Sequence, residues 1–249
     1  MHLFGLIGFP LTHSFSKKYF TEKFKGLGLS NSHEYDLFEI ESATDFPSLF
    51  EKYPQLKGIN ITIPHKQSVF DYLDELDISA EKVGAVNVVK KTADNKLIGY
   101  NSDYYGFQRS LLEFLGEGFD IKKLKALILG YGGAAKAVVA ALEDLGVQVQ
   151  LVSRKSSEKA VNYKESDSLI KSHKLIINCT PLGTYPKSEE FPSIDYAELN
   201  SGHFLFDLVY NPPESVFLRK GKEQGASVKN GYDMLVYQAE KSWDIWQES

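Results

Sequence analysis

The residue types that can do chemistry gather at the ends of predicted strands in the first half of the chain. They are Ser14, Ser16, Asn60, Thr62, His65, Lys66, Asn87, Asn101 and Asp103. Ser, Thr and Asn side chains donate and accept hydrogen bonds, so a set of them suits a ligand with several hydroxyl groups. A lysine can bind a carboxylate or move a proton, and a carboxylate can orient its ammonium group. The set therefore predicts a site for a small polyhydroxylated ligand, in which Lys66 and Asp103 could share acid–base work.

A glycine-rich turn opens the second half of the chain. The motif Gly130-x-Gly132-x-x-Ala135 lies between a predicted strand at 124–129 and a predicted helix that ends near Leu145. Gly130 permits a tight turn, Gly132 lets the backbone approach a pyrophosphate, and the helix N-terminus offers N–H groups to the anion. Because the motif sits in a complete strand–helix–strand unit, it favours dinucleotide binding over a purely structural turn. The loop residues expected at the cofactor are Gly130, Tyr131, Gly132, Gly133, Ala134 and Ala135.

The end of the next strand, predicted at 147–152, indicates which dinucleotide is bound. An acid about 20 residues after the first glycine binds the ribose of NAD, whereas basic residues there accommodate the 2′-phosphate of NADP. Ser153, Arg154 and Lys155 occupy this place, 153 − 130 = 23 residues on, and no acid accompanies them. The two cations can also be read as solvated surface charges, but their position favours NADP.

Two further strands, predicted at 174–179 and 203–209, are each followed by a polar loop that contains proline. Ligands of open parallel sheets bind at the carboxyl ends of the strands, so the loops that begin at Thr180 and Tyr210 should face the nicotinamide. Cys179 lies at one of these strand ends. Nothing adjacent activates its thiol, so it is predicted to be a packing residue.

Strand-length apolar runs alternate with helix-period segments along the chain, which is typical of α/β proteins with parallel or mixed sheets. In the first half the predicted strands are 2–9, 33–41, 56–63, 86–91 and 96–101, and the predicted helices are 16–27, 65–73 and 104–115. A last helix at 232–247 carries an apolar stripe, with Gln238 on another part of its surface.

Composition excludes several classes of protein. The 249 residues are 43% hydrophobic and 24% charged, as in folded globular chains. A net charge of −5 without a basic face argues against nucleic acid, and no apolar stretch is long enough to span a membrane. A single cysteine excludes a disulfide scaffold and fits the cytoplasm, and the apolar start carries no leader. No metal is expected, since no ligand spacing joins His2, His13, His33, His173 and His203.

Seven short motifs follow one another along the chain. They are Gly8-Phe-Pro-Leu-Thr-His-Ser14-Phe-Ser16, Asn60-Ile-Thr62-Ile-Pro-His-Lys66, Gly84-Ala-Val-Asn87, Gly99-Tyr-Asn101-Ser-Asp103-Tyr-Tyr-Gly106, Asn178-Cys-Thr180-Pro-Leu-Gly183, Asp207-Leu-Val-Tyr210-Asn-Pro and Asn230-Gly231-Tyr-Asp-Met-Leu-Val-Tyr-Gln238-Ala. Together with the glycine loop, these motifs resemble the shikimate dehydrogenase family in their order and spacing over almost the whole chain.

The resemblance implies an oxidoreductase that reversibly reduces 3-dehydroshikimate to shikimate with NADPH, a step toward chorismate and the aromatic amino acids. It implies Lys66 and Asp103 as the catalytic pair. The residues that would hold the substrate are Ser14, Ser16, Asn60, Thr62, Asn87, Tyr210 and Gln238. The residues that would join the glycine loop at the cofactor are Ser153, Arg154, Lys155, Thr180, Val209 and Gly231.

The family fold implies two α/β domains with the active site in the cleft between them. Residues 1–103 would form a substrate-binding domain with a mixed sheet, completed by the C-terminal helix 231–249. Residues 104–230 would form a Rossmann-like NADP-binding domain, beginning with a linker helix at 104–115. The expected partner is the small-molecule substrate, and the expected assembly is a monomer or a homodimer.

Two alternatives remain open: a quinate/shikimate dehydrogenase with relaxed specificity, and a regulatory module that binds NADP without turnover. The lack of an acid near Ser153 argues against NAD, and the presence of both Lys66 and Asp103 argues against a mere binder. The sequence departs from the family pattern at a few positions near the predicted site. A small residue is usual at the position of Tyr131, and Thr is usual at those of Ser102 and Lys155. Met is usual at the position of Thr184, and Pro at that of Asp233.

Overall fold

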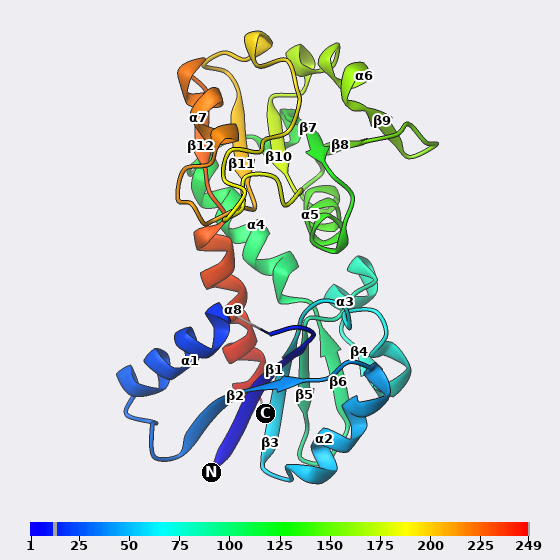
Figure 1. Cartoon of the computed structure of the whole chain (residues 1–249), viewed down its shortest axis with the longest axis vertical. Coiled ribbons are helices and arrows are strands. Elements are labelled where there is room, and N and C mark those ends of the chain that lie inside the picture. The colour runs from blue at the N-terminus through cyan, green and yellow to red at the C-terminus, as the bar shows by residue number, and fades with distance from the viewer. Residues whose placement is uncertain (12–13, 249) are drawn as a thin grey trace. The chain divides into compact units, whose positions relative to one another are not determined.

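In the computed structural model, which describes residues 1–11 and 14–248, the chain divides into two compact units (Figure 1). Unit 1 consists of Met1–Ser102 and Gln238–Ser249, and unit 2 of Asp103–Tyr237. Three residues lie outside the described part: Thr12 and His13 of the first motif, and Ser249 at the end of the predicted C-terminal helix.

Unit 1 is built on a mixed six-stranded sheet in the order β2-β1-β3-β5-β6-β4. The strands are β1 His2–Gly8, β2 His33–Glu39, β3 Leu56–Ile61, β4 Glu75–Leu76, β5 Val88–Lys91 and β6 Leu97–Tyr100. β1 runs parallel to β2 and β3, whereas β5 is antiparallel to both β3 and β6. The ends of β1, β3 and β6 therefore meet the start of β5 along one edge, called here the site edge. The starts of β1, β2, β3 and β6 meet the end of β5 along the other, called the far edge.

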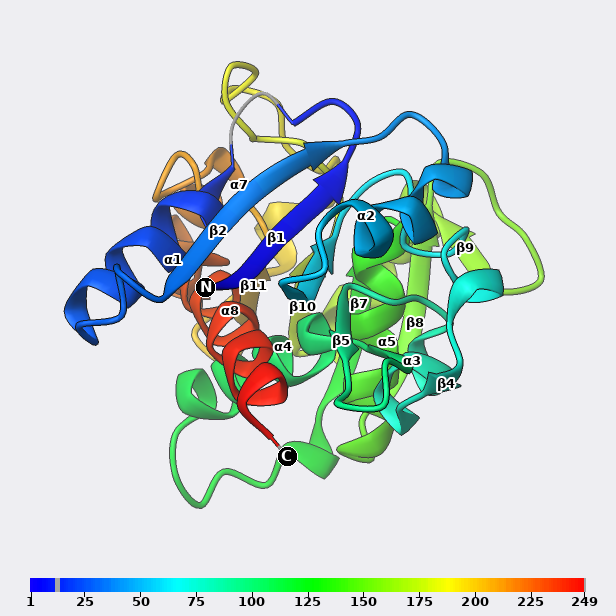
Figure 2. The same cartoon turned by 90° about the horizontal axis from the view of Figure 1, so that it is seen from below.

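Helices cover both faces of this sheet, as Figures 1 and 2 show. They are α1 Phe15–Gly26, α2 Phe46–Lys52, α3 Ile78–Val83 and the part of α8 (Tyr232–Gln247) from Gln238 onward. Successive side chains of a strand point to opposite faces. In β1, accordingly, Phe4 packs with α1 and α8 in one apolar cluster, and Ile7 packs with α2 in another. Both faces of the sheet are thus buried.

One predicted helix of unit 1 is wrong. Residues 65–73 form consecutive turns followed by the 3₁₀ helix Phe70–Tyr72. The segment is held largely by bonds between residues three apart, such as Tyr72 N to Val69 O at 3.0 Å, so it winds more tightly than an α-helix. The predicted strands, the helix at 16–27 and the helix at 104–115 are confirmed, and their ends lie within two residues of the predicted positions.

Unit 2 contains a six-stranded sheet in which every neighbouring pair is parallel. Its strands are β7 Lys125–Leu129, β8 Gln148–Ser153, β9 Ala160–Asn162, β10 Leu175–Asn178, β11 Phe204–Asp207 and β12 Ser227–Lys229. Read from β9, the spatial order is third, second, first, fourth, fifth, sixth, which is the Rossmann order. The predicted α/β fold class, with a mixed sheet and a Rossmann-like sheet, is confirmed.

The remaining helices belong to unit 2 or begin at its border. They are α4 Ser102–Leu115, α5 Gly133–Asp144, α6 Tyr163–Asp167 and α7 Val216–Glu223. Phe217 and Leu218 of α7 pack with Leu127 and Leu129 of β7 on one face of the sheet. Phe107 of α4 meets the ring of Phe206 from β11, with centroids 5.2 Å apart. Throughout the described residues, no helix has the length and apolar character needed to cross a membrane.

Candidate functional site

The site edge of unit 1 collects most of the residues predicted to bind substrate. The register pairs Asn60 with Val88 and Val88 with Tyr100, so the end of β3, the start of β5 and the end of β6 are neighbours. Thr62 extends the sheet, because its N–H donates to the carbonyl of Ile7 at 2.9 Å. Strand direction thus brings together segments that are far apart in the sequence.

Ser14 and Ser16 open helix α1 after β1. Ser14 is the N-cap of this helix, and its Oγ accepts a hydrogen bond from Lys17 N at 3.2 Å. The Ser16 side chain hydrogen bonds to Tyr35 of β2. Both serines are half-buried, so capping does not remove them from solvent and each keeps hydrogen-bonding capacity for a ligand.

Asn60 is the centre of a buried polar network beneath the site edge. Its Oδ1 accepts from the Tyr35 hydroxyl at 2.8 Å, and its Nδ2 donates to Ser242 Oγ at 3.0 Å and to the Asn87 carbonyl at 3.3 Å. Burial raises the pKa of Tyr35, against the lowering effect of its bond to Ser16, so the phenol stays a neutral donor. Asn60 is only 5% exposed and both its N–H bonds are used, so any substrate contact would fall to the remaining lone pair of Oδ1.

The same network continues to Asn87 and Gln238. Asn87 Oδ1 accepts from Ser102 N at 2.6 Å, and Asn87 Nδ2 donates to Ser102 Oγ at 3.1 Å. Ser102 Oγ in turn lies 3.2 Å from Ser242 Oγ and 3.5 Å from Gln238 Oε1. Asp103, predicted to be catalytic, directly follows the anchored Ser102 in the chain and is half-buried in the first turn of α4.

Lys66 lies in the turns that follow β3 and is half-buried. Its carbonyl accepts from Val86 N at 2.8 Å, which holds the turn against the segment before β5. The adjacent His65 is 2% exposed, with Nε2 2.7 Å from the Ile40 carbonyl oxygen. His65 is therefore a packing residue, and Lys66 is the titratable side chain of this turn that reaches the surface.

Sequence reasoning missed Tyr35 and Ser242 as partners of the predicted residues. Ser242 stands four residues after Gln238, so the two share a face of α8, and this spacing was the available signal. Tyr35 gave none, because nothing in the sequence around β2 indicates that its hydroxyl meets an amide on β3.

In unit 2 the glycine loop forms the switch between β7 and α5. Gly130 has φ +92°, and a Cβ there would lie 2.7 Å from Cγ2 of Thr180, so both conformation and space require glycine. Gly132 is the N-cap of α5 and offers no side chain to its N–H groups. A Cβ on Gly132 or Gly133 would meet no atom within 4 Å. Open space thus lies over a helix N-terminus whose donors lack a side-chain cap, which fits a pyrophosphate.

The loop after β10 is fixed next to this turn by a buried carboxylate. Asp207, at the end of β11, accepts from Asn178 Nδ2 at 2.9 Å, from Val209 N at 3.0 Å and from the Ser215 hydroxyl. Asn178 Oδ1 accepts from Thr180 N at 3.0 Å and from Thr180 Oγ1 at 2.6 Å. Burial raises the pKa of Asp207 to about 6, although the hydrogen bonds lower it. This series of hydrogen bonds from Asp207 through Asn178 to Thr180 therefore fixes the loop at the carboxyl ends of the strands.

The two basic residues predicted to bind the 2′-phosphate of NADP follow β8. Arg154 and Lys155 are exposed, and among the described residues neither has an acidic ion-pair partner. The Ser153 hydroxyl donates to the Lys155 carbonyl and tightens this turn. Two unpaired cations beside a hydroxyl suit a phosphate monoester.

Of the remaining predicted residues of unit 2, Val209 and Tyr210 lie in the loop after β11, and Gly231 lies between β12 and α8. Val209 is buried, and its carbonyl accepts from Gly231 N at 3.2 Å. A Cβ at Gly231 would lie 2.3 Å from the Leu208 carbonyl oxygen, so this close approach requires glycine. Tyr210 is 41% exposed. Burial and the charge of Asp207 raise the pKa of the half-buried Cys179, which agrees with its interpretation as a packing residue.

Among the described side chains, no three of His, Cys, Asp or Glu come together as metal ligands. The predicted site therefore consists of hydroxyls, amides, Lys66 and Asp103 in unit 1 and at its border, and of a glycine loop in unit 2. A Rossmann-order sheet with a glycine loop at its switch point defines a dinucleotide-binding α/β protein.

Comparisons with known proteins narrow this class. Residues 6–89 match the family described as shikimate dehydrogenase substrate binding domain. A relative from Clostridium beijerinckii, named shikimate dehydrogenase (NADP(+)), is 42% identical over 100% of this chain and 93% of its own length. The chain belongs to the shikimate dehydrogenase family.

Solved structures agree with this assignment. A chorismate mutase/shikimate 5-dehydrogenase fusion protein from Clostridium acetobutylicum superposes with a TM-score of 0.87 at 34% identity, covering 99% of this chain and 91% of that one. Shikimate 5-dehydrogenase from Listeria monocytogenes, solved in complex with shikimate and NAD, gives a TM-score of 0.87 at 30% identity over 100% and 92% of the two chains.

Proposed function

We propose that this chain is an enzyme that catalyses the reversible, NADP-dependent oxidation of shikimate to 3-dehydroshikimate. The observation that carries the proposal is the 42% identity, over the whole chain, to a relative named shikimate dehydrogenase (NADP(+)). The parallel Rossmann-order sheet with its open glycine loop supports the cofactor half of the assignment. In physiological terms, the reductive direction supplies shikimate to the pathway of chorismate and aromatic amino acids.

We assign substrate binding to residues 1–103 and 231–249, and cofactor binding to residues 104–230. The hydroxyls of Ser14, Ser16 and Thr62 and the amides of Asn87 and Gln238 would bind the carboxylate and hydroxyl groups of the substrate, and we assign Tyr210 to substrate binding as well. The buried network of Tyr35, Asn60, Ser102 and Ser242 supports this role, because it fixes the rotamers of Asn87 and Gln238 before a ligand arrives.

We assign the proton chemistry to Lys66 and Asp103. Oxidation of a secondary alcohol releases one proton from the hydroxyl. In our assignment the neutral amine of Lys66 takes up that proton, and the Asp103 carboxylate orients the ammonium group that forms. In the reductive direction the same Nζ returns the proton to the alkoxide. The bound NADP supplies the hydride chemistry. The anchoring of Ser102 by Asn87 supports this role for Asp103, because it fixes the backbone that carries the carboxylate.

The cofactor preference rests on the turn after β8. NADP differs from NAD by a phosphate on the ribose, and Arg154 and Lys155 are exposed cations in the place where that phosphate is read. The complex of the Listeria monocytogenes enzyme with NAD favours a second candidate, in which NAD is also accepted.

The deciding experiment measures the absorbance of reduced nicotinamide with purified protein in four mixtures: shikimate or quinate, each with NADP or NAD. We expect turnover with shikimate and NADP. Comparable rates with quinate or NAD would replace the proposal with an enzyme of relaxed specificity. Absence of turnover in all four mixtures, from protein that still binds NADPH, would replace it with a regulatory module.

We further propose a cytoplasmic location and a monomer or homodimer. The lone thiol, Cys179, fits a reducing compartment. Light scattering on a sizing column measures the assembly directly, and a mass above that of two chains would contradict the second part.

A further inference from the structure

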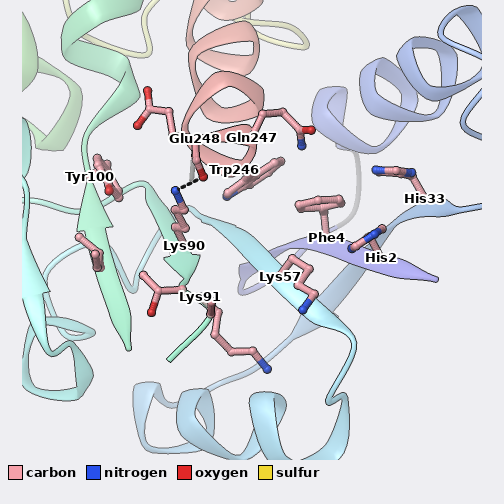
Figure 3. A pocket seen from close by; sticks show the side chains of 13 residues that line it. His2, Phe4, His33, Lys57, Lys90, Lys91, Tyr100, Trp246, Gln247 and Glu248 are labelled. Atoms are coloured by element: carbon pink, nitrogen blue, oxygen red, sulfur yellow. Dashed lines mark hydrogen bonds between the residues drawn. The ribbon is translucent and has the colours of Figure 1, made fainter. Parts of the chain in front are cut away.

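Helix α1 carries Ser14 and Ser16 at its N-terminus, and its buried face packs on apolar side chains of unit 1. Phe20 is fully buried, and its ring centroid lies 5.3 Å from that of Trp246 of α8. Trp246 also stacks on Phe4 of β1, with centroids 4.8 Å apart, and these two side chains line the pocket at the far edge that Figure 3 shows. Hydrophobic attraction is non-directional, whereas a hydrogen bond fixes the two groups that form it. The polar contacts of α1 therefore limit how the helix can shift on this surface.

Two polar contacts join α1 to the neighbouring strand β2. Lys17 Nζ donates to Asp36 Oδ1 at 2.7 Å, and the Ser16 side chain hydrogen bonds to Tyr35. The side chains of the ion pair are 47% and 45% exposed, so solvent screens the pair and it stabilises the helix little. The other contact uses a hydroxyl that we assign to the substrate. Neither contact thus holds α1 independently of both solvent and ligand.

A third set of polar contacts joins α1 to Glu240 of α8, and the two helices lie side by side (Figures 1 and 2). Oε1 of Glu240 accepts from the Tyr19 hydroxyl, and Oε2 accepts from Lys23 Nζ at 2.6 Å. Tyr19 and Lys23 are four residues apart, so they lie on one face of α1, one turn from each other. A single carboxylate therefore binds two successive turns of the helix, through a different oxygen for each.

The contact with Glu240 is better shielded from solvent than the ion pair on β2. The side chain of Lys23 is 16% exposed, and that of Glu240 is 35% exposed. Burial lowers the pKa of Lys23, against the effect of the Asp244 charge, and burial together with that charge raises the pKa of Glu240. Each of the two charges is costly at its position without the other. Their pairing therefore favours one placement of α1 on α8.

Helix α8 also carries a residue of the predicted substrate set. Gln238 lies two residues before Glu240, which is about 3 Å of helical rise. Ser102 Oγ lies 3.5 Å from Gln238 Oε1 and 3.2 Å from Ser242 Oγ, so Gln238 and Ser242 face the buried network of the site edge. One side of α8 thus contacts this network while Glu240 binds α1. A single helix connects Gln238 to the helix that bears the two serines.

We propose that Glu240 is a positioning residue for substrate binding. By binding two turns of α1, it fixes Ser14 and Ser16 relative to Gln238. The inference rests on the proposed function, because it takes these three side chains as ligands of shikimate. Lys66 follows β3 and is not carried by α1, so we expect Glu240 to affect the binding of substrate more than the chemical step.

Steady-state kinetics on Glu240→Ala measures this effect. KM for shikimate should rise about tenfold, while kcat and the KM for NADP should change less than about threefold, because uniform binding is what is lost. Tyr19→Phe removes one of the two contacts and should give a smaller rise. Glu22→Ala is the matched control, since Glu22 is an exposed acid of α1 that pairs with Lys18 of the same helix. This variant should leave the KM within about twofold of the parent value.

Double variants distinguish positioning from a general loss of stability. If Glu240 acts through the serines, Ser16→Ala should raise the KM much less in the Glu240→Ala background than in the parent, because the serine is already displaced. Thr62 follows β3 and bonds to the Ile7 carbonyl of β1, so it is not held by α1. The effects of Thr62→Val and Glu240→Ala on the KM should therefore multiply. Effects of Ser16→Ala and Glu240→Ala that multiply in the same way would contradict the proposal.

Hydrogen exchange tests the contact with α1 without any turnover. In Glu240→Ala the backbone amides of residues 15–26 should exchange at least about fivefold faster than in the parent, and those of residues 56–61 should not change. In an active protein, either unchanged exchange in α1 or an unchanged KM for shikimate would overturn the role of Glu240. A parent protein that does not turn over shikimate would instead overturn the proposed function, and the exchange rates would still show whether Glu240 holds α1.

Discussion

Asn87 holds Ser102 through both ends of its side-chain amide. Oδ1 accepts from the backbone N–H of Ser102 at 2.6 Å, and Nδ2 donates to the Ser102 hydroxyl at 3.1 Å. Helix α4 begins at Ser102, so a side chain at the start of β5 fixes the first residue of the helix that carries Asp103. Asn87 therefore positions the backbone around the predicted catalytic aspartate.

Ser102→Ala should lower the free energy of unfolding by about 1–2 kcal/mol, because the buried amide of Asn87 and the hydroxyl of Ser242 each lose a partner. Urea unfolding measures this change. Ser102→Thr keeps the hydroxyl and should lose less. A stability of the Ala variant equal to that of the parent would mean that the network contributes nothing to folding.

Lys66→Ala should reduce turnover with shikimate by about 10²–10⁴-fold, with a smaller change in KM, since proton transfer is needed in the transition state. Lys66→Arg keeps the positive charge but cannot act as a base at neutral pH, so it should restore binding and not turnover. Steady-state kinetics on both variants separates the two effects. Unchanged turnover in Lys66→Ala would remove this residue from the mechanism.

Arg154→Ala should weaken NADP binding by about 1–3 kcal/mol and leave NAD binding nearly unchanged, because only NADP carries the ribose phosphate. Calorimetric titration with each cofactor provides the comparison. Lys159→Ala, at an exposed cation farther along the same segment, is the matched control. An equal loss for both cofactors would contradict the phosphate contact.

Gly132→Ala should leave folding nearly intact and weaken NADP binding by about tenfold or more. Its φ of −101° suits any residue, and its Cβ would meet no protein atom within 4 Å, so only a bound pyrophosphate would be displaced. Gly130→Ala should instead unfold more easily, because φ is +92° and Thr180 lies 2.7 Å from the new Cβ. Thermal unfolding and cofactor titration of both variants test this contrast. Tight NADP binding by Gly132→Ala would place the pyrophosphate elsewhere.

The free energy of unfolding should fall as the pH rises from about 4 to 6, because Asp207 loses its proton in this range. Its pKa in the folded state is raised to about 6 from an ordinary value of 3.8, so the folded state binds the proton more tightly than the unfolded state. The stabilisation from this tighter proton binding is complete below pH 4 and is lost as the pH passes 6. The loss in the free energy of unfolding is up to about 3 kcal/mol. In Asp207→Asn this dependence should vanish. Urea unfolding between pH 4 and 7 measures it, and identical slopes for the two proteins would contradict the prediction.

Local signals carried the sequence-based predictions that hold. The alternation of Ile59 and Ile61 predicts β3, and the spacing of Gly130, Gly132 and Ala135 predicts the turn into α5. Each depends on a few neighbouring residues. The predicted helix after β3 failed because its apolar spacing resembles a helix, while its hydrogen bonds join residues three apart.

Non-local features could not be predicted in this way. Nothing in the sequence indicates that the side-chain amide of Asn60 bonds to Tyr35 and to Ser242, which is 182 residues away in the chain. The contacts of Asp207 are also non-local, since its partner Asn178 is the last residue of β10 and its partner Ser215 is the N-cap of α7. Strand register creates such contacts, and it is decided by the whole sheet rather than by any one segment.

Unit 2 is inserted within unit 1, and this order affects how the protein is made. Ile245 and Trp246 complete the apolar cluster around Phe4 and Phe20. A ribosome synthesises the chain from its N-terminus, so Phe4 and Phe20 lack Ile245 and Trp246 as packing partners until the end of translation. Unit 2 is contiguous and can fold before that point. We therefore expect unit 1 to be the part that chaperones protect on the nascent chain, although its residues emerge first.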